Sequence, residues 1–349
     1  MDISIPYYED LTRISNSNIG WFLNKGPAFL HKMLTDPPPE EKNPVLERGT
    51  MIHEYLLQPE EFQKDYVIWD KSRPSSAQQE KFCQAYASSL EIEPNKAVLE
   101  AYKAAYSTKG KTEETMLSEG SKIASTLKDY IDYLKSGDQR IMIGPYDYQM
   151  LKKIRNNIQS HKLANTLLNS SKILRDHKND VIFETHHEFH INWEDPTPYT
   201  VNIGQNETEK GLYKVKCKSL LDSLTLDFKH KKATIMDLKT TAKLWHFEDS
   251  IEMYDYCRQL CYYTMAVKWY LNNELTEDSF EWTFEYYIIG IDTTGSNEIR
   301  VFKIEPGMVE DRKDTIYKAL FEIAWHQVNN KWEHSREYYE GDGSETLNL

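Results

Sequence analysis

The sequence lacks long apolar runs: none of its segments approaches the roughly 20 apolar residues that are needed to span a bilayer. Its first residues, MDISIPYYED, also lack the basic segment and the apolar segment of a secretory signal. We therefore expect a protein that stays in the cytoplasm where it is made and has no membrane partner.

Cysteine is scarce, with four among 349 residues, at positions 83, 217, 257 and 261. This count and spacing exclude a disulfide framework and the usual zinc-binding patterns. Cys257 and Cys261 lie four residues apart in an expected helix and share a face, so a metal pair is one interpretation. We prefer the other one, small buried thiols.

Positive charge is in deficit, because 42 Lys and Arg face 55 Asp and Glu and give a formal net charge of −13. Such a balance argues against a protein whose whole surface coats nucleic acid or an anionic membrane. A local basic groove remains compatible with it.

The order of the patterns favours an α/β (α+β) fold. Helical spacing dominates before residue 170, alternation with a period of two dominates 181–241, and a long helix is expected at 247–271 before two further strands and a helix at 307–332. We divide the chain into an N-terminal helical part, a helical insertion, a core with a central sheet flanked by helices, and an acidic, flexible tail: 1–71, 72–135, 136–332 and 333–349.

The sharpest chemical feature is Asp222, followed fifteen residues later by Asp237-Leu238-Lys239 on the next strand-like run. Because successive strand residues alternate between faces, Asp237 and Lys239 must share one face. If the two runs pair, Asp222 lies beside them. Ile235 and Met236 precede Asp237 and predict a buried strand, in which charges must be compensated or functional.

Two carboxylates and an amine around one point suit the hydrolysis of a phosphodiester. Carboxylates and a backbone carbonyl hold Mg²⁺, which acidifies a water molecule and neutralises charge on phosphoryl oxygens. Lys239 would orient or deprotonate the attacking water, and we expect desolvation to lower its pKa toward that role.

Five segments in order resemble the motifs of the PD-(D/E)xK nuclease superfamily, and most of all its RecE-like (exodeoxyribonuclease VIII type) phage and prophage exonucleases. Lambda exonuclease and the RecB and AddB nuclease domains are more distant. The segments are SNSNIGWFLNKGPAFLHKML, LERGTMIHEYLLQPEEF, KCKSLLDSLTLDF, IMDLKTT and QLCYY. The resemblance covers roughly 15–58 and 181–271, and it implies a restriction-endonuclease-like core with a mixed sheet within 136–332.

Carried over to this sequence, the resemblance implies a role for each matching residue. His53 contacts the metal directly or through water, Asp222 and Asp237 are metal carboxylates, and the Leu238 carbonyl is a further ligand. Lys239 is the catalytic lysine, and Gln259 and Tyr263 match a Q-x₃-Y motif that lines the site. These two residues are equally compatible with ordinary helix packing.

The family also has an acid on the strand before Asp222, and both Glu184 and Glu188 qualify; we favour Glu188. The usual basic residue before the first Asp is replaced by lysines, and we expect phosphate contacts from three of them: Lys216, Lys218 and Lys243. Related nucleases with an iron-sulfur cluster have a cysteine spacing that this chain lacks, so no cluster is expected. The expected cofactor is Mg²⁺, with Mn²⁺ as an alternative.

The resemblance implies a metal-dependent deoxyribonuclease, a 5′ to 3′ exonuclease that degrades linear double-stranded DNA from its ends and leaves 3′ single strands for recombination by annealing. It further implies a homo-oligomer, a single-strand annealing protein as partner, and phage or bacterial origin. The alternatives are a RecB-like repair enzyme or structure-specific endonuclease, and a catalytically silent DNA-binding or interaction protein of the same fold.

Lysines concentrate around the proposed site in the sequence. Between 209 and 243 there are nine lysines against four acids, a local balance of +5. Because phosphate contacts supply much of the affinity for DNA, we expect DNA to meet one positive groove there. The 72–135 insertion weakly resembles the helix-turn-helix of phage terminase small subunits, which would make it an accessory DNA-binding element. We prefer the other interpretation, a plain helical hairpin that covers the core.

Overall fold

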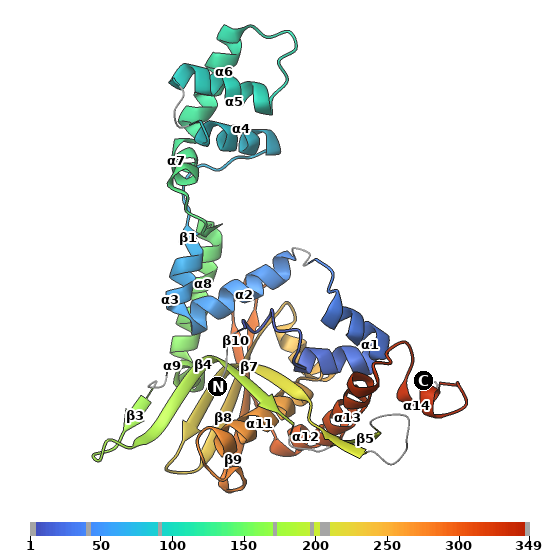
Figure 1. Ribbon diagram of the computed structural model, residues 1–349. Helices are drawn as coiled ribbons and strands as arrows, with labels where there is room; N and C mark the ends of the chain where they lie inside the picture. The colour runs from blue at the N-terminus through green and yellow to red at the C-terminus, as the bar shows by residue number, and fades with distance from the viewer. Residues whose placement is uncertain are drawn as a thin grey trace. The chain divides into compact units, whose positions relative to one another are not determined.

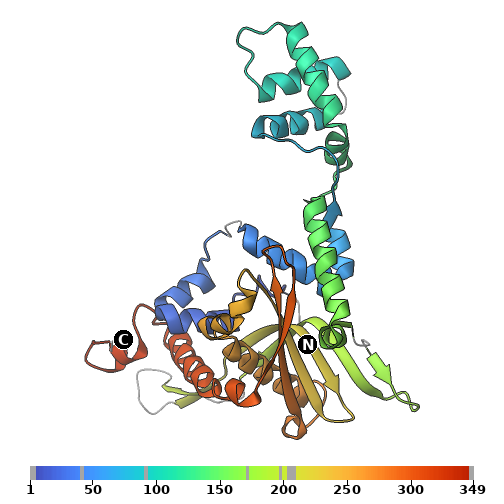
Figure 2. The ribbon, with the colours of Figure 1, turned by 180° about the vertical axis from the view of Figure 1, so that it is seen from behind.

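The computed structural model describes residues 5–39, 43–89, 93–169, 173–195, 199–202 and 210–345 (Figures 1 and 2). The chain divides into two compact units, a larger one of Met1–Pro59 with Lys152–Leu349 and a smaller one of Glu60–Leu151. Among the described residues, no helix combines the length and the apolar character that crossing a bilayer requires.

A six-stranded sheet in the order β10-β9-β8-β7-β4-β3 forms the centre of the larger unit. Its strands β8 and β9 run parallel, whereas all other neighbours are antiparallel, so the sheet is mixed. The strands are β3 (Ile173–Arg175), β4 (Val181–Glu194), β7 (Lys216–Asp227), β8 (Lys232–Thr241), β9 (Thr283–Asp292) and β10 (Ile299–Ile304). A separate pair, β5 (Tyr199–Asn202) and β6 (Lys210–Tyr213), is antiparallel. The predicted α+β class with a central sheet is confirmed.

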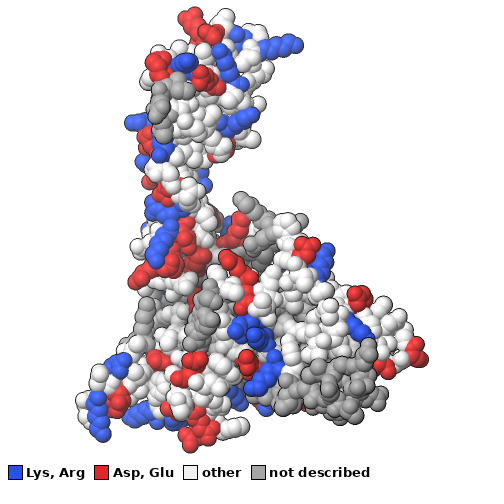
Figure 3. Space-filling view, in the orientation of Figure 1, with Lys and Arg blue, Asp and Glu red and all other residues white. Residues whose placement is uncertain are grey.

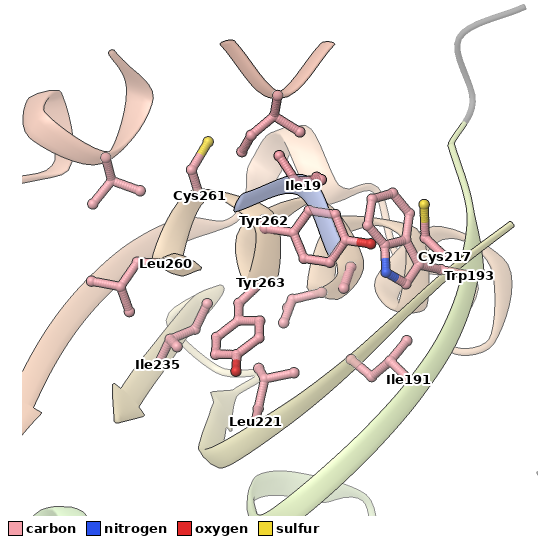
Figure 4. Packing of buried hydrophobic residues seen from close by; sticks show 14 of the residues in the cluster. Ile19, Ile191, Trp193, Cys217, Leu221, Ile235, Leu260, Cys261, Tyr262 and Tyr263 are labelled. Carbon is pink, nitrogen blue, oxygen red and sulfur yellow. The ribbon is translucent and has the colours of Figure 1, made fainter. Parts of the chain in front are cut away.

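Helices of the larger unit cover this sheet, and α11 packs on β4, β7 and β8 while α13 packs on α11 and α1 (Figure 1). Figure 4 shows the core that results, with Trp193 of β4 beside Tyr262 of α11 and Cys217 of β7. The helices are α1 (Asn16–Thr35), α2 (Pro44–Leu57), α9 (Lys162–Asn169), α10 (Phe247–Met253), α11 (Tyr256–Asn273), α12 (Pro306–Glu310), α13 (Lys313–Asn329) and α14 (Arg336–Glu340), with short 3₁₀ turns η1 (Leu244–His246) and η2 (Ser279–Glu281). All four cysteines are buried free thiols, as preferred above.

The long helix expected at 247–271 is interrupted, because α10 ends at Met253 and α11 begins at Tyr256. Asp255 between them has a left-handed φ of 47° and caps α11 by accepting the backbone N–H of Arg258 at 3.3 Å. A side chain that satisfies the first turn of a new helix favours such a restart. The helix expected at 307–332 is also divided in two, as α12 and α13.

The segment before α1 replaces a strand beside the first half of β7. Ile14 forms a parallel bridge with Cys217, through Ile14 N to Lys216 O and Lys218 N to Ile14 O, both at 2.9 Å. Ser15 then caps α1 in a reciprocal pair with Asn18. Two backbone groups that β8 leaves unpaired on this part of β7, the carbonyl of Lys216 and the N–H of Lys218, are thereby satisfied.

The smaller unit has its own apolar core, formed by α4 to α7 around Phe82 and Tyr102. Gly110 lies in the turn between α5 and α6 with a left-handed φ of +74°. Gly120 lies inside α6, where a Cβ would come within 2.7 Å of the Val98 side chain. Its elements are α3 (Pro59–Asp65), β1 (Tyr66–Ile68), α4 (Ala77–Ala87), α5 (Pro94–Ala105), α6 (Glu113–Thr126), α7 (Lys128–Ser136), β2 (Ile141–Ile143) and the first part of α8 (Pro145–Ser160), which continues into the larger unit after Leu151, with β1 parallel to β2.

The acidic segment after 332 contacts the larger unit over its described residues, 333–345. Arg336 of α14 pairs with Glu322 of α13 through two guanidinium nitrogens, and the Trp325 indole N–H donates to Glu340 at 2.8 Å. This part of the segment is therefore not solvated throughout.

Candidate metal and phosphodiester site

Three carboxylates lie in one row across three adjacent strands. His187 pairs with Ser223 and Phe189 with Leu221, so Glu188 of β4 lies opposite Asp222 of β7. On the other side of β7, the pairing of Ser223 with Met236 brings Asp222 opposite Asp237 of β8 at the next register position. The sheet thus aligns Glu188, Asp222 and Asp237.

The row lies where the strand pairing is interrupted. Glu188 has a left-handed φ of 47°, and the β7–β8 ladder ends at Ser223 and Met236, one residue before the two aspartates. The Asp222 carboxylate enters the gap and accepts the backbone N–H of Leu238 at 2.6 Å. In an extended strand the N–H and C=O of one residue point to the same side, so the Leu238 carbonyl also faces this gap.

Helix α2 adds His53 to the row. Its Nδ1 lies 3.6 Å from Asp222 Oδ2 and 4.0 Å from Glu188 Oε1, and one ligand atom from each of the three residues falls within 4.8 Å of the others. Gly49, one turn earlier on the same face, permits this approach, because a Cβ there would lie only 3.3 Å from the Thr240 hydroxyl of β8.

Lys239 forms an ion pair with Asp237, the neighbour on the same strand face that alternation predicts. The Asp237 side chain is almost completely buried, and the Lys239 ammonium lies 5.0 Å from the centre of the Tyr256 ring at the start of α11. Aromatic contact and a carboxylate together hold this cation in one position.

Burial and mutual repulsion raise the pKa values of two carboxylates of the row, Glu188 and Asp237. The pKa of Glu188 is raised to about 8, first by burial and then by Asp222, Asp237 and Glu54. Burial also raises the pKa of Asp237, to about 6, although Lys239 opposes the change. A row of acids that resists ionisation favours a cation among them.

The pKa of Lys239 departs from the sequence prediction. Burial lowers this pKa, as expected, but Asp237 and Asp222 outweigh burial and leave it above the ordinary value. In the chain by itself Lys239 is therefore a cation that can orient a water molecule, and the prediction of a lowered pKa is wrong.

The donors present fit a hard divalent cation. Asp237 Oδ1 is completely buried and has no hydrogen-bond partner among the described residues, which leaves a lone pair without a donor. Three carboxylates and one imidazole suit Mg²⁺ or Mn²⁺, which prefer oxygen ligands, better than a soft metal. The residues that the sequence assigns to the metal are thus brought together, and Mg²⁺ stays a proposal.

Helix α11 places the predicted Gln259 and Tyr263 behind the row. The Gln259 amide donates to the Tyr263 hydroxyl at 2.7 Å, and Tyr263 is buried with its hydroxyl end directed toward Leu221, next to Asp222 (Figure 4). Burial, followed by Asp237 and Asp222, raises the pKa of Tyr263 well above its ordinary value, so this phenol stays neutral beside the carboxylates.

The structure places only one of the two candidate acids of β4 in the row of carboxylates. Glu188 lies opposite Asp222, whereas Glu184 pairs with Leu226 and lies 3.0 Å from the His186 ring. Two neighbours of the row were missed in the sequence: Glu54, which acts on the Glu188 pKa, and Tyr256. The sequence could have indicated both residues by their position next to predicted site residues, because Glu54 follows His53 and Tyr256 begins the helix that carries Gln259.

The three lysines assigned to phosphate contacts lie in different environments. Lys216 and Lys243 are exposed. Lys218 is 6% exposed, and its ammonium donates to the carbonyls of Tyr7 at 2.5 Å and Asp10 at 2.6 Å. This location favours a structural role for Lys218, as the anchor of the N-terminal segment.

The local excess of lysine does not gather around the row. Residues 229–232 lie at the far end of β7 and β8, and with about 3.3 Å per strand residue they are roughly 20 Å from Lys239. Two of these lysines pair there with acids, Lys231 with Glu277 and Lys232 with Glu285. Figure 3 likewise shows acidic and basic side chains intermingled on its face of the larger unit.

We predict that Glu188→Gln stabilises the metal-free protein in a pH-dependent way. The folded-state pKa of about 8 exceeds the ordinary value of 4.5, so ionisation costs stability progressively as the pH rises from about 4.5 to 8. Each pKa unit is worth about 1.4 kcal/mol. The free energy of unfolding, measured with denaturant in EDTA, should be similar for the variant and wild type at pH 5. At pH 8 it should be higher for the variant by a few kcal/mol. Glu194→Gln at the end of the same strand is the control, and a pH-independent difference would contradict the prediction.

We predict that substitution of one lysine of β7 lowers stability, whereas substitution of another lowers the affinity for DNA. Lys218→Met leaves two backbone carbonyls without their donor and should cost about 1–3 kcal/mol of stability, with faster proteolysis before residue 14. Lys216→Met should change stability by less than about 0.5 kcal/mol, but should weaken DNA binding and reduce its salt dependence. Thermal unfolding and salt titrations of DNA affinity separate the two, and a stable Lys218→Met protein with weakened DNA binding would reverse the assignment.

Comparison with known proteins does not identify the reaction or the site residues of this chain. No protein-family model matches the sequence, and no curated protein sequence matches it. A solved structure from Eubacterium rectale, described as a "Putative exonuclease", is similar at 11% sequence identity and a TM-score of 0.44, over 100% of this chain and 96% of that chain. The chemistry of this chain is therefore inferred from its own residues.

Proposed function

We propose that this protein is a metal-dependent deoxyribonuclease that acts on the ends of linear double-stranded DNA. The observation that carries the proposal is the row of Glu188, Asp222 and Asp237 at a gap between strands, with Lys239 paired to the last of them. Structural ion pairs have no need for three mutually repelling carboxylates, whereas a phosphodiester hydrolase needs them to bind its metal.

Four side chains would hold Mg²⁺, with Mn²⁺ as an alternative: His53, Glu188, Asp222 and Asp237. The Leu238 carbonyl, which faces the same gap, is a further donor. When bound, Mg²⁺ supplies Lewis acidity, which makes water a better nucleophile and neutralises charge on the phosphoryl oxygens.

The remaining residues position the reactants. Lys239 stays protonated and donates to the oxygen of the attacking water or of the phosphate, while Asp237 and the Tyr256 ring fix its ammonium. Asp222 holds the two strands at their point of divergence through the Leu238 N–H. The neutral Tyr263 and Gln259 support the row from behind and keep bulk water from that side.

The direction of degradation, 5′ to 3′, and a 3′ single-stranded product follow from the resemblance to RecE-like exonucleases. The same resemblance supports a homo-oligomer and an annealing protein as partner, which sedimentation and co-purification would check. A structure-specific endonuclease and a silent DNA-binding protein are the alternatives that the experiment below separates.

The test uses linear duplex DNA labelled at its 5′ or 3′ ends and covalently closed circular duplex, each with Mg²⁺ or with EDTA. We expect metal-dependent degradation of the linear DNA alone, with early release of the 5′ label. Cutting of the circles would favour the endonuclease. Binding without metal-dependent cleavage of either DNA would contradict the proposal and favour the silent protein.

A further inference from the structure

The break between α10 and α11 exposes a large aromatic side chain close to Lys239. Tyr254 is 60% exposed and Met253 is 77% exposed, although both belong to a segment whose neighbours Phe247 and Ile251 are buried. Because single exposed apolar side chains are common on protein surfaces, the contacts of this ring, and not its exposure alone, indicate a role.

Tyr254 is the outer end of a row of stacked rings. Phe302 of β10 stacks on Phe247 at 5.0 Å, Phe247 on Tyr256 at 6.0 Å, and Tyr256 on Tyr254 at 5.8 Å, with interplanar angles between 23° and 30°. The Lys239 ammonium lies 5.0 Å from the third ring, Tyr256. These four stacked rings therefore extend from the core, past the Lys239 ammonium, to the surface.

Asp255 fixes the orientation of the outer ring. Its left-handed backbone, which a non-glycine residue rarely adopts, brings Tyr254 and Tyr256 into stacking contact although one residue separates them. Its carboxylate accepts from Arg312 Nε at 2.7 Å and from the backbone N–H of Arg258. Strain of this kind persists where the surrounding structure holds it in place, and it concentrates at functional sites.

We propose that Tyr254 is a stacking platform for an unpaired nucleobase next to the phosphate that is cleaved; this inference rests on the proposed function. The two steps of 5.0 Å and 5.8 Å place the Tyr254 ring within about 11 Å of the Lys239 ammonium. At about 3.4 Å per nucleotide, that is a base within about three nucleotides of the phosphate.

An exposed aromatic ring such as that of Tyr254 is suited to bind an unpaired nucleobase and not the outer surface of a duplex. An aromatic face binds any nucleobase by stacking, independent of sequence, provided that the face of the base is uncovered. Inside a duplex both faces are covered by neighbours, so only a frayed end or a single strand offers one. The enzyme should thus prefer ends that have opened over ends that are clamped shut.

The test measures binding without cleavage, in EDTA, with oligonucleotides that carry the fluorescent base 2-aminopurine, whose emission falls on stacking. The probes are a single strand, a duplex with an unpaired end, and a duplex whose end is closed by a hairpin. The variants are Tyr254→Ala, Tyr254→Phe and Tyr254→Trp. Phe280→Ala, which removes a ring that is 92% exposed on η2, is the matched control.

We expect Tyr254→Ala to weaken binding of the single strand and of the open duplex by roughly 5- to 100-fold and to abolish the quenching. Tyr254→Phe, Tyr254→Trp and Phe280→Ala should behave like wild type, and the closed duplex should be bound equally by all. Equal binding and quenching by Tyr254→Ala, or an equal loss on all three probes, would overturn the inference.

This test is separate from that of the nuclease. Wild-type protein that quenches the probe but never cleaves DNA with Mg²⁺ would support the platform and refute the nuclease. Wild-type protein that cleaves DNA while Tyr254→Ala binds normally would refute the platform alone.

Discussion

Lys239→Met should reduce the rate of phosphodiester hydrolysis by about 10²–10³-fold while the protein still binds metal and DNA. An ammonium that donates to the reacting oxygens contributes most in the transition state, and removal of one such donor from a preorganised site costs about this much. The loss should appear in kcat, because the four metal donors and the surface lysines remain. Rapid-quench cleavage of labelled linear duplex, together with Mg²⁺ titration, measures both properties.

The same substitution leaves Asp237 without its ion-pair partner in a buried place, so some stability will be lost as well. Lys232→Met is the matched control, since it removes a lysine from the other end of β8 that pairs with Glu285. Lys239→Arg keeps the charge and should recover part of the rate. Wild-type turnover by Lys239→Met would remove the lysine from the mechanism.

Asp237→Asn should abolish stabilisation of the protein by Mg²⁺. A ligand at one hundred times its dissociation constant stabilises the folded state by about 2.7 kcal/mol, which raises the Tm by several degrees. Asp237 supplies the buried oxygen that lacks a donor, so its amide variant should lose most of this increase. Without metal, Asp237→Asn loses the ion pair with Lys239 as well as the repulsion from Asp222 and Glu188, so the Mg²⁺ effect on each protein is measured against its own metal-free Tm.

Glu285→Gln on β9 is the control for this experiment, because it removes a carboxylate from the same sheet away from the row. Thermal unfolding with and without Mg²⁺ gives the two shifts. An equal Mg²⁺ effect in wild type and Asp237→Asn would place the cation elsewhere.

The centre of the site could be predicted from the sequence because it depends on local periods. Strand alternation places Asp237 and Lys239 on one face, and four-residue spacing places Gly49 and His53 on one helix face. Buried flanking residues such as Ile235 and Leu238 made these charges conspicuous. Such signals need no knowledge of distant parts of the chain.

Other features depend on contacts between distant segments and could not be predicted. The choice between Glu184 and Glu188 follows from the register of β4 on β7, which the alternation of either strand leaves open. Lys218 is buried because the residues around Tyr7 and Asp10 fold over it. The pKa of Lys239 is raised because two carboxylates outweigh burial, and only the assembled row sets that balance.

The position of the lysines relative to the site could not be predicted from the sequence either. A count along 209–243 treats the lysines as one group, whereas the hairpin between β7 and β8 carries those at 229–232 to the end of the sheet away from Asp222. In a pair of antiparallel strands, residues close to the connecting turn lie far from residues at the other end of the same strands. Contacts to DNA near the site would therefore come from residues just beyond β8, such as the exposed Lys243.

The most direct test of the carboxylate row is the single-turnover rate of cleavage of end-labelled linear duplex DNA, measured with Mg²⁺ for wild type and for Asp237→Asn purified in the same way. We predict cleavage by wild type that stops on addition of EDTA, and a rate for Asp237→Asn that is lower by about 10²–10³-fold, which is the loss expected when one preorganised electrostatic group is removed. Equal rates for the two proteins, or no metal-dependent cleavage by wild type, would contradict the proposed function.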